Sequence, residues 1–163
     1  MMSRAFVFGD AIDTDLLAPG NLMKLPPAEL AQHCLRAIAP DFASTVQPGD
    51  VVFAGANFGL GSSREQAAVS LRLLGVSAVL ATSFARIFYR NAINLGLPAF
   101  VFPQVGEVSD GDRILLDPVA GRLENITTGK TYALTPIPPH LMAMIEDDGL
   151  IPHLKRRLKG AAA

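Results

Sequence analysis

The alternation of short apolar runs with helical segments constrains the fold more than any other feature of the sequence. Apolar, β-branched runs at residues 50–55, 76–81 and 98–102 lie next to glycine or proline, as buried strands do. The segments between them, 64–74 and 84–95, place apolar side chains at helical spacing. Strand–helix–strand repeats of this kind predict a parallel sheet with right-handed crossovers. In such sheets, ligands bind beyond the carboxyl ends of the strands.

The character of the sequence changes after Pro103, where short runs alternate with turns that contain glycine. These runs predict a second, antiparallel layer. The sequence therefore favours an α/β fold, organised as a single domain over residues 1–163, with a mainly parallel sheet plus a smaller antiparallel layer. The expected later elements are strands at 113–116, 122–126 and 131–134 and helices at 139–145 and 149–158.

Residues 57–65, with the sequence Asn-Phe-Gly-Leu-Gly-Ser-Ser-Arg-Glu, join the first of these strands to its helix. The two glycines suit a sharp turn or the close approach of a ligand to the backbone. Ser62, Ser63 and Arg64 then come at the expected start of the helix, where free N–H groups and the helix dipole attract anions. The loop predicts an anion site that also carries a hydroxyl able to act as a base.

Both serines fit a capping box, because Ser62 precedes Glu65 by three residues and Ser63 precedes Gln66 by three. We therefore expect the helix to begin at the serines, with one hydroxyl as its cap. The other hydroxyl would then be free to face a ligand.

The loop resembles the signature of the swivelling domain of aconitase-type hydro-lyases. Residues 9–15, Gly-Asp-Ala-Ile-Asp-Thr-Asp, resemble the Gly-Asp-x-Ile-x-Thr-Asp opening of that family. Residues 83–92, Ser-Phe-Ala-Arg-Ile-Phe-Tyr-Arg-Asn-Ala, and the Gly-Leu-Pro at 96–98 resemble its next helix and strand. Together the matches extend over residues 5–103. The resemblance implies a three-layer β/β/α swivelling domain, in agreement with the strands and helices expected from periodicity.

The chain length of 163 residues is similar to that of the free-standing small subunits in this family, above all the isopropylmalate isomerases of leucine biosynthesis. The resemblance implies a hydro-lyase that dehydrates and rehydrates a small dicarboxylic hydroxy acid. It also implies a partner, a large subunit that carries a [4Fe-4S] cluster and shares the active site. The isolated chain is expected to be inactive.

The resemblance also implies roles for the loop residues. Ser62 takes the place of the family's general base, and Ser63 and Arg64 take the places of groups that bind a substrate carboxylate. A serine alkoxide is far from the resting protonation state of the residue, so nearby positive charge must stabilise it. The Arg64 guanidinium can hold a carboxylate through two parallel hydrogen bonds.

In this family a loop shortly after the opening motif contacts the variable group of the substrate, and residues 21–25 occupy its place here. Leu22 and Met23 suit an isopropyl group, whereas Lys24 suits a third carboxylate. Ordinary packing also explains Leu22 and Met23. The substrate therefore stays open among isopropylmalate, homoaconitate, methylmalate or citraconate, and dimethylmalate.

Cysteine and histidine usage gives no metal site in this chain. Cys34 is the single cysteine and lies in the helical pattern of residues 29–38, whereas an iron–sulfur cluster normally needs three or four thiolates. His33, His140 and His153 are scattered, without ligand spacing. We expect Cys34 to be a core residue, and the cluster to belong to the partner.

Composition narrows the class of protein further. Fourteen Lys and Arg against fifteen Asp and Glu give a net charge of −1, which argues against a nucleic-acid surface. No apolar run is long enough to span a membrane, and the N-terminal one is too short for a secretory signal. The expected location is the cytoplasm.

Three further interpretations stay open. Arg86 and Arg90 share one helical face, which either is solvated or contacts the large subunit or the substrate. A domain that docks a partner should expose an apolar patch near Ser62, which predicts a homo-oligomer for the isolated chain. In a different class of function, the loop serves a non-catalytic anion-binding or regulatory module.

Overall fold

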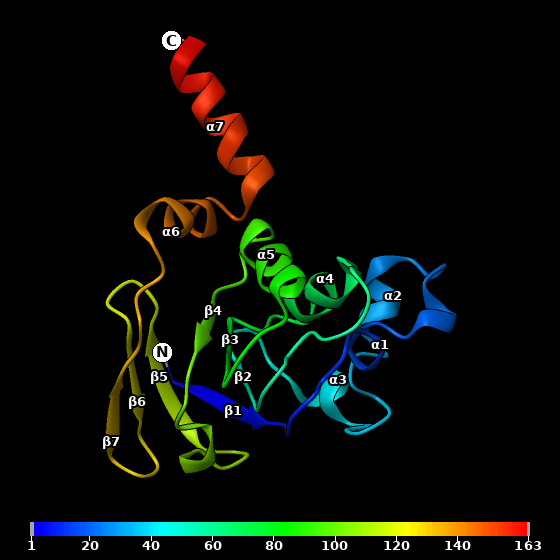
Figure 1. The fold of residues 1–163 in the computed structure, drawn as a ribbon, viewed down its shortest axis with the longest axis vertical. Helices are drawn as coiled ribbons and strands as arrows, with labels where there is room; N and C mark the ends of the chain where they lie inside the picture. The colour runs from blue at the N-terminus through cyan, green and yellow to red at the C-terminus, as the bar shows by residue number, and fades with distance from the viewer. Residues whose placement is uncertain (1, 163) are drawn as a thin grey trace.

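The computed structural model describes residues 2–162, and within them one sheet holds seven strands in the order β4-β3-β2-β1-β5-β6-β7 (Figure 1). The strands are β1 Ser3–Val7, β2 Val51–Ala54, β3 Ala78–Ala81, β4 Ala99–Val101, β5 Arg113–Asp117, β6 Arg122–Asn125 and β7 Lys130–Ala133. The helices are α1 Thr14–Leu17, α2 Pro27–Ala31, α3 Phe42–Thr45, α4 Gln66–Leu73, α5 Arg86–Asn94, α6 Pro139–Glu146 and α7 Leu150–Ala162, with 3-10 turns η1 Gly20–Leu22 and η2 Val105–Glu107.

Strands β1 to β4 run parallel, as the strand–helix–strand pattern predicted. Val52 pairs with Phe6 on one side and with Val79 on the other, and Val79 pairs in turn with Ala99. Helix α4 connects β2 to β3 and α5 connects β3 to β4, which are the two predicted crossovers. Their loops therefore gather at the carboxyl edge of the parallel strands.

Strands β5 to β7 form the predicted antiparallel part, and β5 joins it to the parallel part by pairing Ser3 of β1 with Ile114. The antiparallel strands then fold over one face of the parallel strands. Ile114 and Leu123 from β5 and β6 share a buried cluster with Phe53 and Leu80 from β2 and β3. The predicted second layer is confirmed, and β1 makes it continuous with the first.

The opposite face of β2 and β3 is covered by helices. Val52 and Val79 lie in a second buried cluster with Leu71 of α4 and Phe88 of α5. Successive strand residues point to opposite faces, so each of these fully buried strands contributes to both clusters. The result is the expected order of antiparallel strands, parallel strands and helices, which Figure 1 shows from left to right.

The predicted capping box is wrong. Helix α4 begins at Gln66, its N-cap is Glu65, and no side chain caps it. Instead the Arg64 N–H donates to the Ser62 carbonyl at 2.8 Å, so the chain makes an extra turn before the helix starts. Neither Ser62 nor Ser63 is occupied as a cap, and both side chains are exposed.

The helical pattern of residues 29–38 is interrupted. Helix α2 ends at Ala31, and Leu35 has a left-handed backbone with a φ of 59°. This turn lets the Leu35 N–H donate to the Leu16 carbonyl at 2.8 Å while Cys34 becomes fully buried. Burial raises the pKa of the Cys34 thiol well above its ordinary value. Cys34 is therefore the core residue that the sequence predicted.

Helices α6 and α7 close the chain, and α7 extends away from the rest of the structure (Figure 1). Asp147 between them accepts hydrogen bonds from Arg156 and from His153, the latter at 2.8 Å. His153 therefore has a structural partner in the first turn of α7. None of the helices within residues 2–162 is long and apolar enough to cross a membrane.

Candidate functional site

Two loops interlock at the carboxyl edge of the parallel strands, one after β1 and the serine loop, residues 57–65, after β2. The Gly59 N–H donates to the Ile12 carbonyl at 2.7 Å, and the Thr14 N–H donates to the Leu60 carbonyl at 2.8 Å. These bonds bring the two motifs of the sequence, residues 9–15 and 57–65, into direct contact.

Glycine is required at two positions of the serine loop. Gly59 has a φ of 83°, and a Cβ built there would lie 2.2 Å from the Cβ of Phe88 on α5. Gly61 has a φ of 120°, and its Cβ would lie 2.8 Å from the Thr14 hydroxyl oxygen. Only a residue without a side chain fits this backbone and these neighbours. The glycines thus let the loop pack closely against α5 and Thr14.

The Ser62 side chain lies against a buried threonine. The Thr14 hydroxyl oxygen is 3.3 Å from Ser62 Oγ and accepts the Ser62 N–H at 3.2 Å. Because it accepts that N–H, Thr14 keeps its own hydrogen to donate to Ser62 Oγ. Thr14 is 3% exposed, so its hydroxyl is held in place by the surrounding structure. Sequence reasoning missed this role, although the Thr-Asp of the opening motif was the available signal.

The Arg64 side chain is held by the segment that follows Thr14. Its Nη1 donates to Asp15 Oδ1 at 3.2 Å and to the Ala18 carbonyl at 3.1 Å. A Cβ at Gly20 would lie 3.0 Å from Arg64 Nη2, so the glycine leaves room for the guanidinium. Nε and Nη2 donate to no other residue among 2–162, which leaves them for an incoming carboxylate. The structure thus places a hydroxyl and an oriented cation on one loop.

The carboxyl group of Asp15 has a pKa below its ordinary value. Its pKa is lowered first by the Gly20 N–H, which donates at 2.8 Å, and then by Arg64. The lowered folded pKa means that the stabilising contribution of this carboxylate is present above pH 3.8 and is lost as pH falls through the folded pKa. Carboxyl NMR titration should give a midpoint below 3.8, and Arg64→Ala should raise it. A midpoint at or above the ordinary value would contradict the contact.

The remaining predicted site residues are placed differently. Ser63 is exposed beside Ser62. Leu22 ends η1 and lines a pocket of about 280 Å³ together with Asp15, the residue that holds Arg64. Within residues 2–162, Lys24 is exposed and Met23 is half-buried, and neither has a hydrogen bond or ion pair to the serine loop. The structure therefore groups Ser62, Ser63, Arg64 and the pocket of Leu22, but not Met23 and Lys24.

The described residues do not fit an iron–sulfur cluster. Within residues 2–162, no three His, Cys, Asp or Glu side chains gather in a way that could hold a metal ion. Cys34 is fully buried, and burial raises the pKa of its thiol. Both features disfavour the thiolate that a metal ligand requires.

Comparison with known proteins confirms the resemblance. The model of the aconitase C-terminal domain matches residues 39–105. The 3-isopropylmalate dehydratase small subunit 1 of Thermotoga maritima is 50% identical over 155 residues, which are 94% of this chain and 93% of the relative. The methanogen homoaconitase small subunit of Methanothermobacter thermautotrophicus is 46% identical over 151 residues, 92% of this chain and 88% of the relative.

The fold has a counterpart among solved structures. The crystal structure of a 3-isopropylmalate dehydratase from Methanocaldococcus jannaschii matches with a TM-score of 0.93 and 40% identity, over 99% of this chain and 96% of that one. The chain therefore belongs to the family of 3-isopropylmalate dehydratase small subunits, which share the fold of the aconitase C-terminal domain.

Proposed function

We propose that this chain is the small subunit of a 3-isopropylmalate dehydratase, which interconverts 2-isopropylmalate and 3-isopropylmalate in leucine biosynthesis. One observation carries the proposal: the exposed Ser62 hydroxyl, bonded to Thr14, stands on the same loop as the Arg64 guanidinium, bonded to Asp15. Nearly full-length similarity to small subunits of that enzyme supports the choice of reaction.

The reaction needs two kinds of chemistry. A poorly acidic proton next to a carboxylate must be removed by a base, and hydroxide must be expelled with the help of a Lewis acid. This chain has residues for the first task and for holding the substrate. We propose that a large subunit carries the [4Fe-4S] cluster, which supplies the Lewis acid when bound. The small subunit is then inactive alone and completes a shared site in the cytoplasm.

Ser62 Oγ takes the substrate proton during dehydration and returns it during rehydration. Before it can do so, the Ser62 hydroxyl must lose its own proton to solvent, to which it is exposed, and two neighbours favour the resulting alkoxide. The Thr14 hydroxyl, at 3.3 Å, can donate to the alkoxide, and the Arg64 cation, two residues further along the same loop, adds positive charge that favours it. The interlocked loops hold the oxygen in place, so little reorganisation is needed when charge develops.

Arg64 and Ser63 bind a substrate carboxylate. Asp15 and Ala18 fix one edge of the guanidinium and leave the other N–H groups to form a bidentate contact. The pocket lined by Leu22 and Leu16 then receives the branched apolar group of the substrate. We propose that Met23 and Lys24, which directly follow Leu22 in the chain but do not line its pocket, influence this choice from outside the pocket.

Thr14→Val should lower the kcat of the reconstituted complex about 10- to 100-fold, because it removes a hydrogen bond to a group that becomes charged. KM should change little, since Thr14 does not contact the substrate carboxylate. Thr14→Ser keeps the hydroxyl and should retain most of the activity. Steady-state kinetics measure kcat and KM for both variants. Equal kcat values for Thr14→Val and Thr14→Ser would show that the Thr14 hydroxyl does not assist Ser62.

Homoaconitate is the second candidate substrate, since the chain is 46% identical to a homoaconitase small subunit and exposes Lys24 after η1. The test is a panel of unsaturated acids, isopropylmaleate, homoaconitate, citraconate and dimethylmaleate, given anaerobically to this chain with its large subunit. Preferred hydration of isopropylmaleate supports the proposal. Preference for homoaconitate, lost in Lys24→Ala, would replace it. If a complex with an intact cluster hydrates none of the four acids, the result would favour the non-catalytic module.

A further inference from the structure

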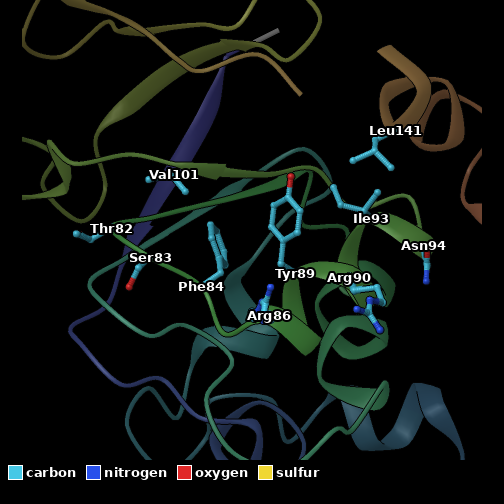
Figure 2. Close-up of a pocket in the computed structure, with 10 residues that line it drawn as sticks. All are labelled: Thr82, Ser83, Phe84, Arg86, Tyr89, Arg90, Ile93, Asn94, Val101 and Leu141. Carbon is cyan, nitrogen blue, oxygen red and sulfur yellow. The ribbon is translucent and has the colours of Figure 1, made fainter. Parts of the chain in front are cut away.

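A pocket of about 580 Å³ lies beside the serine loop, between α5, the ends of β3 and β4, and α6 (Figure 2). It belongs to neither the Ser62 site nor the pocket of Leu22. Aromatic, aliphatic and cationic side chains share its walls, among them Phe84, Arg86, Tyr89, Arg90, Val101 and Leu141.

The pocket wall and the serine loop form one hydrogen-bonded unit. The Asn57 N–H donates to Ser83 Oγ at 2.8 Å, and the Phe58 N–H donates to the Ser83 carbonyl at 3.0 Å. The Ala85 N–H returns a bond to the Phe58 carbonyl at 2.9 Å. The rings of Phe58 and Phe84 pack edge to face, with centroids 6.0 Å apart. A partner that covers the serine loop therefore meets a surface that continues directly into this pocket.

The apolar part of the wall is left open to solvent. Val101 is 50% exposed on β4, the edge strand of the parallel part of the sheet. Tyr89 is half-buried, with its ring 5.9 Å from that of Phe84, and its hydroxyl bonds to no residue among 2–162. Exposed apolar edges of sheets are usually covered, and tyrosine, with an apolar ring and a polar tip, is enriched at protein interfaces. Both features indicate a surface made to be occupied.

The charged part of the wall is cationic and unpaired. Arg86 and Arg90 are exposed one turn apart on α5 and, within residues 2–162, lie within 4 Å of no carboxylate. Among residues 2–162, no Asp or Glu lines the pocket. By contrast, Arg64 and Arg72 on neighbouring elements each pair with an aspartate at 3.2 Å. A complementary occupant must therefore bring negative charge.

We propose that this pocket docks a segment of the large subunit that inserts an apolar or aromatic side chain between Tyr89 and Val101 and sets carboxylates against Arg86 and Arg90. The inference rests on the proposed function, which requires a large subunit over the adjoining serine loop. Tyrosine, phenylalanine and arginine are the residues enriched at the buried centres of interfaces. The pocket is then an anchor for assembly, and Ser62 acts only once it is filled.

The test measures the Kd between this chain and the cluster-loaded large subunit by anaerobic calorimetry. Arg86→Glu with Arg90→Glu should weaken binding about 100-fold or more, because like charges then face each other. Val101→Glu tests the apolar wall at an exposed position and should weaken binding in the same direction. Arg157→Glu with Lys159→Glu, an equal double charge reversal on the exposed helix α7, should leave the Kd unchanged. Thermal unfolding midpoints of all variants should match that of the unaltered chain.

The outcomes separate this inference from the function on which it rests. A raised Kd for the pocket variants, with normal turnover once the large subunit is saturated with variant chain, supports the docking site. An unchanged Kd for both variants, with an active complex, overturns the docking site and leaves the function intact. If the pocket variants bind the large subunit with an unchanged Kd but differ from the unaltered chain in their oligomeric mass when isolated, the pocket is instead a contact between two copies of this chain. Failure of the unaltered chain to bind any large subunit overturns both.

Discussion

Ser62→Ala lowers the kcat of the reconstituted complex by about 10²- to 10⁴-fold, the range expected for the loss of a general base. The side chain is exposed, and among residues 2–162 its oxygen hydrogen-bonds to Thr14 alone, so the substitution leaves the loop and the fold in place. The glycines and backbone bonds that shape the loop do not depend on this hydroxyl. The Kd for the large subunit should therefore stay unchanged while turnover is lost.

Ser63→Ala is the matched control for this prediction. Ser63 is the neighbouring exposed hydroxyl and, among residues 2–162, makes no side-chain hydrogen bond. Its loss should raise KM with a much smaller change in kcat, as expected for a group that binds substrate. Near-normal kcat for Ser62→Ala in an assembled complex would show that another group removes the proton.

Arg64→Ala lowers kcat/KM about 100-fold or more, because two charge-assisted hydrogen bonds to the substrate carboxylate disappear together. Arg64→Lys should be almost as damaging. An ammonium group is a point charge and cannot satisfy both Asp15 and a bidentate carboxylate from the position that Gly20 leaves open. Steady-state kinetics at saturating large subunit measure both effects.

Arg72→Ala provides the comparison for Arg64. Arg72 lies on α4 and pairs with Asp148 at 3.2 Å, the same separation as between Arg64 and Asp15, but it is not part of the serine loop. Removing it should leave kcat/KM near normal, since exposed ion pairs contribute little. Equal losses for the two alanine variants would point to a general effect of charge, and full activity in Arg64→Lys would exclude bidentate binding.

The fold was largely predictable because its strongest signals are local. The apolar runs and helical spacing between residues 50 and 102 specify β2, α4, β3, α5 and β4 without reference to the rest of the chain. The place of β1 could not be found in this way. The connection from β1 to β2 holds the short helices α1, α2 and α3 in place of one long helical pattern, so the sequence does not reveal the pairing by which Ser3–Val7 joins the parallel and antiparallel parts.

The error at the start of α4 has a physical cause. Ser62 and Ser63 are equally good caps by sequence, but the interlocked loops bond Ser62 to Thr14 and shift the first turn to Gln66. A tertiary contact therefore overrides a local capping preference. This displacement leaves the hydroxyl of Ser62 available for chemistry.

The candidate site could be proposed from the sequence as a set of residues, but its contacts could not. Motifs identify Ser62 and Arg64, whereas their partners Thr14 and Asp15 lie 48 and 49 residues earlier in the chain. Only the parallel pairing of β1 with β2 brings the two loops together. In the same way, helical spacing places Arg86 and Arg90 on one face but cannot indicate that Leu141 of α6 closes a pocket beside them.

We propose that this chain supplies the serine and arginine of a site completed by a large subunit. The proposal is tested by titrating the cluster-loaded large subunit with this chain under anaerobic conditions and following hydration of isopropylmaleate. We expect no activity from either protein alone, a rate that rises and saturates with added chain, and binding without turnover for Ser62→Ala. Activity of the large subunit alone, or equal rates with Ser62→Ala, would contradict it.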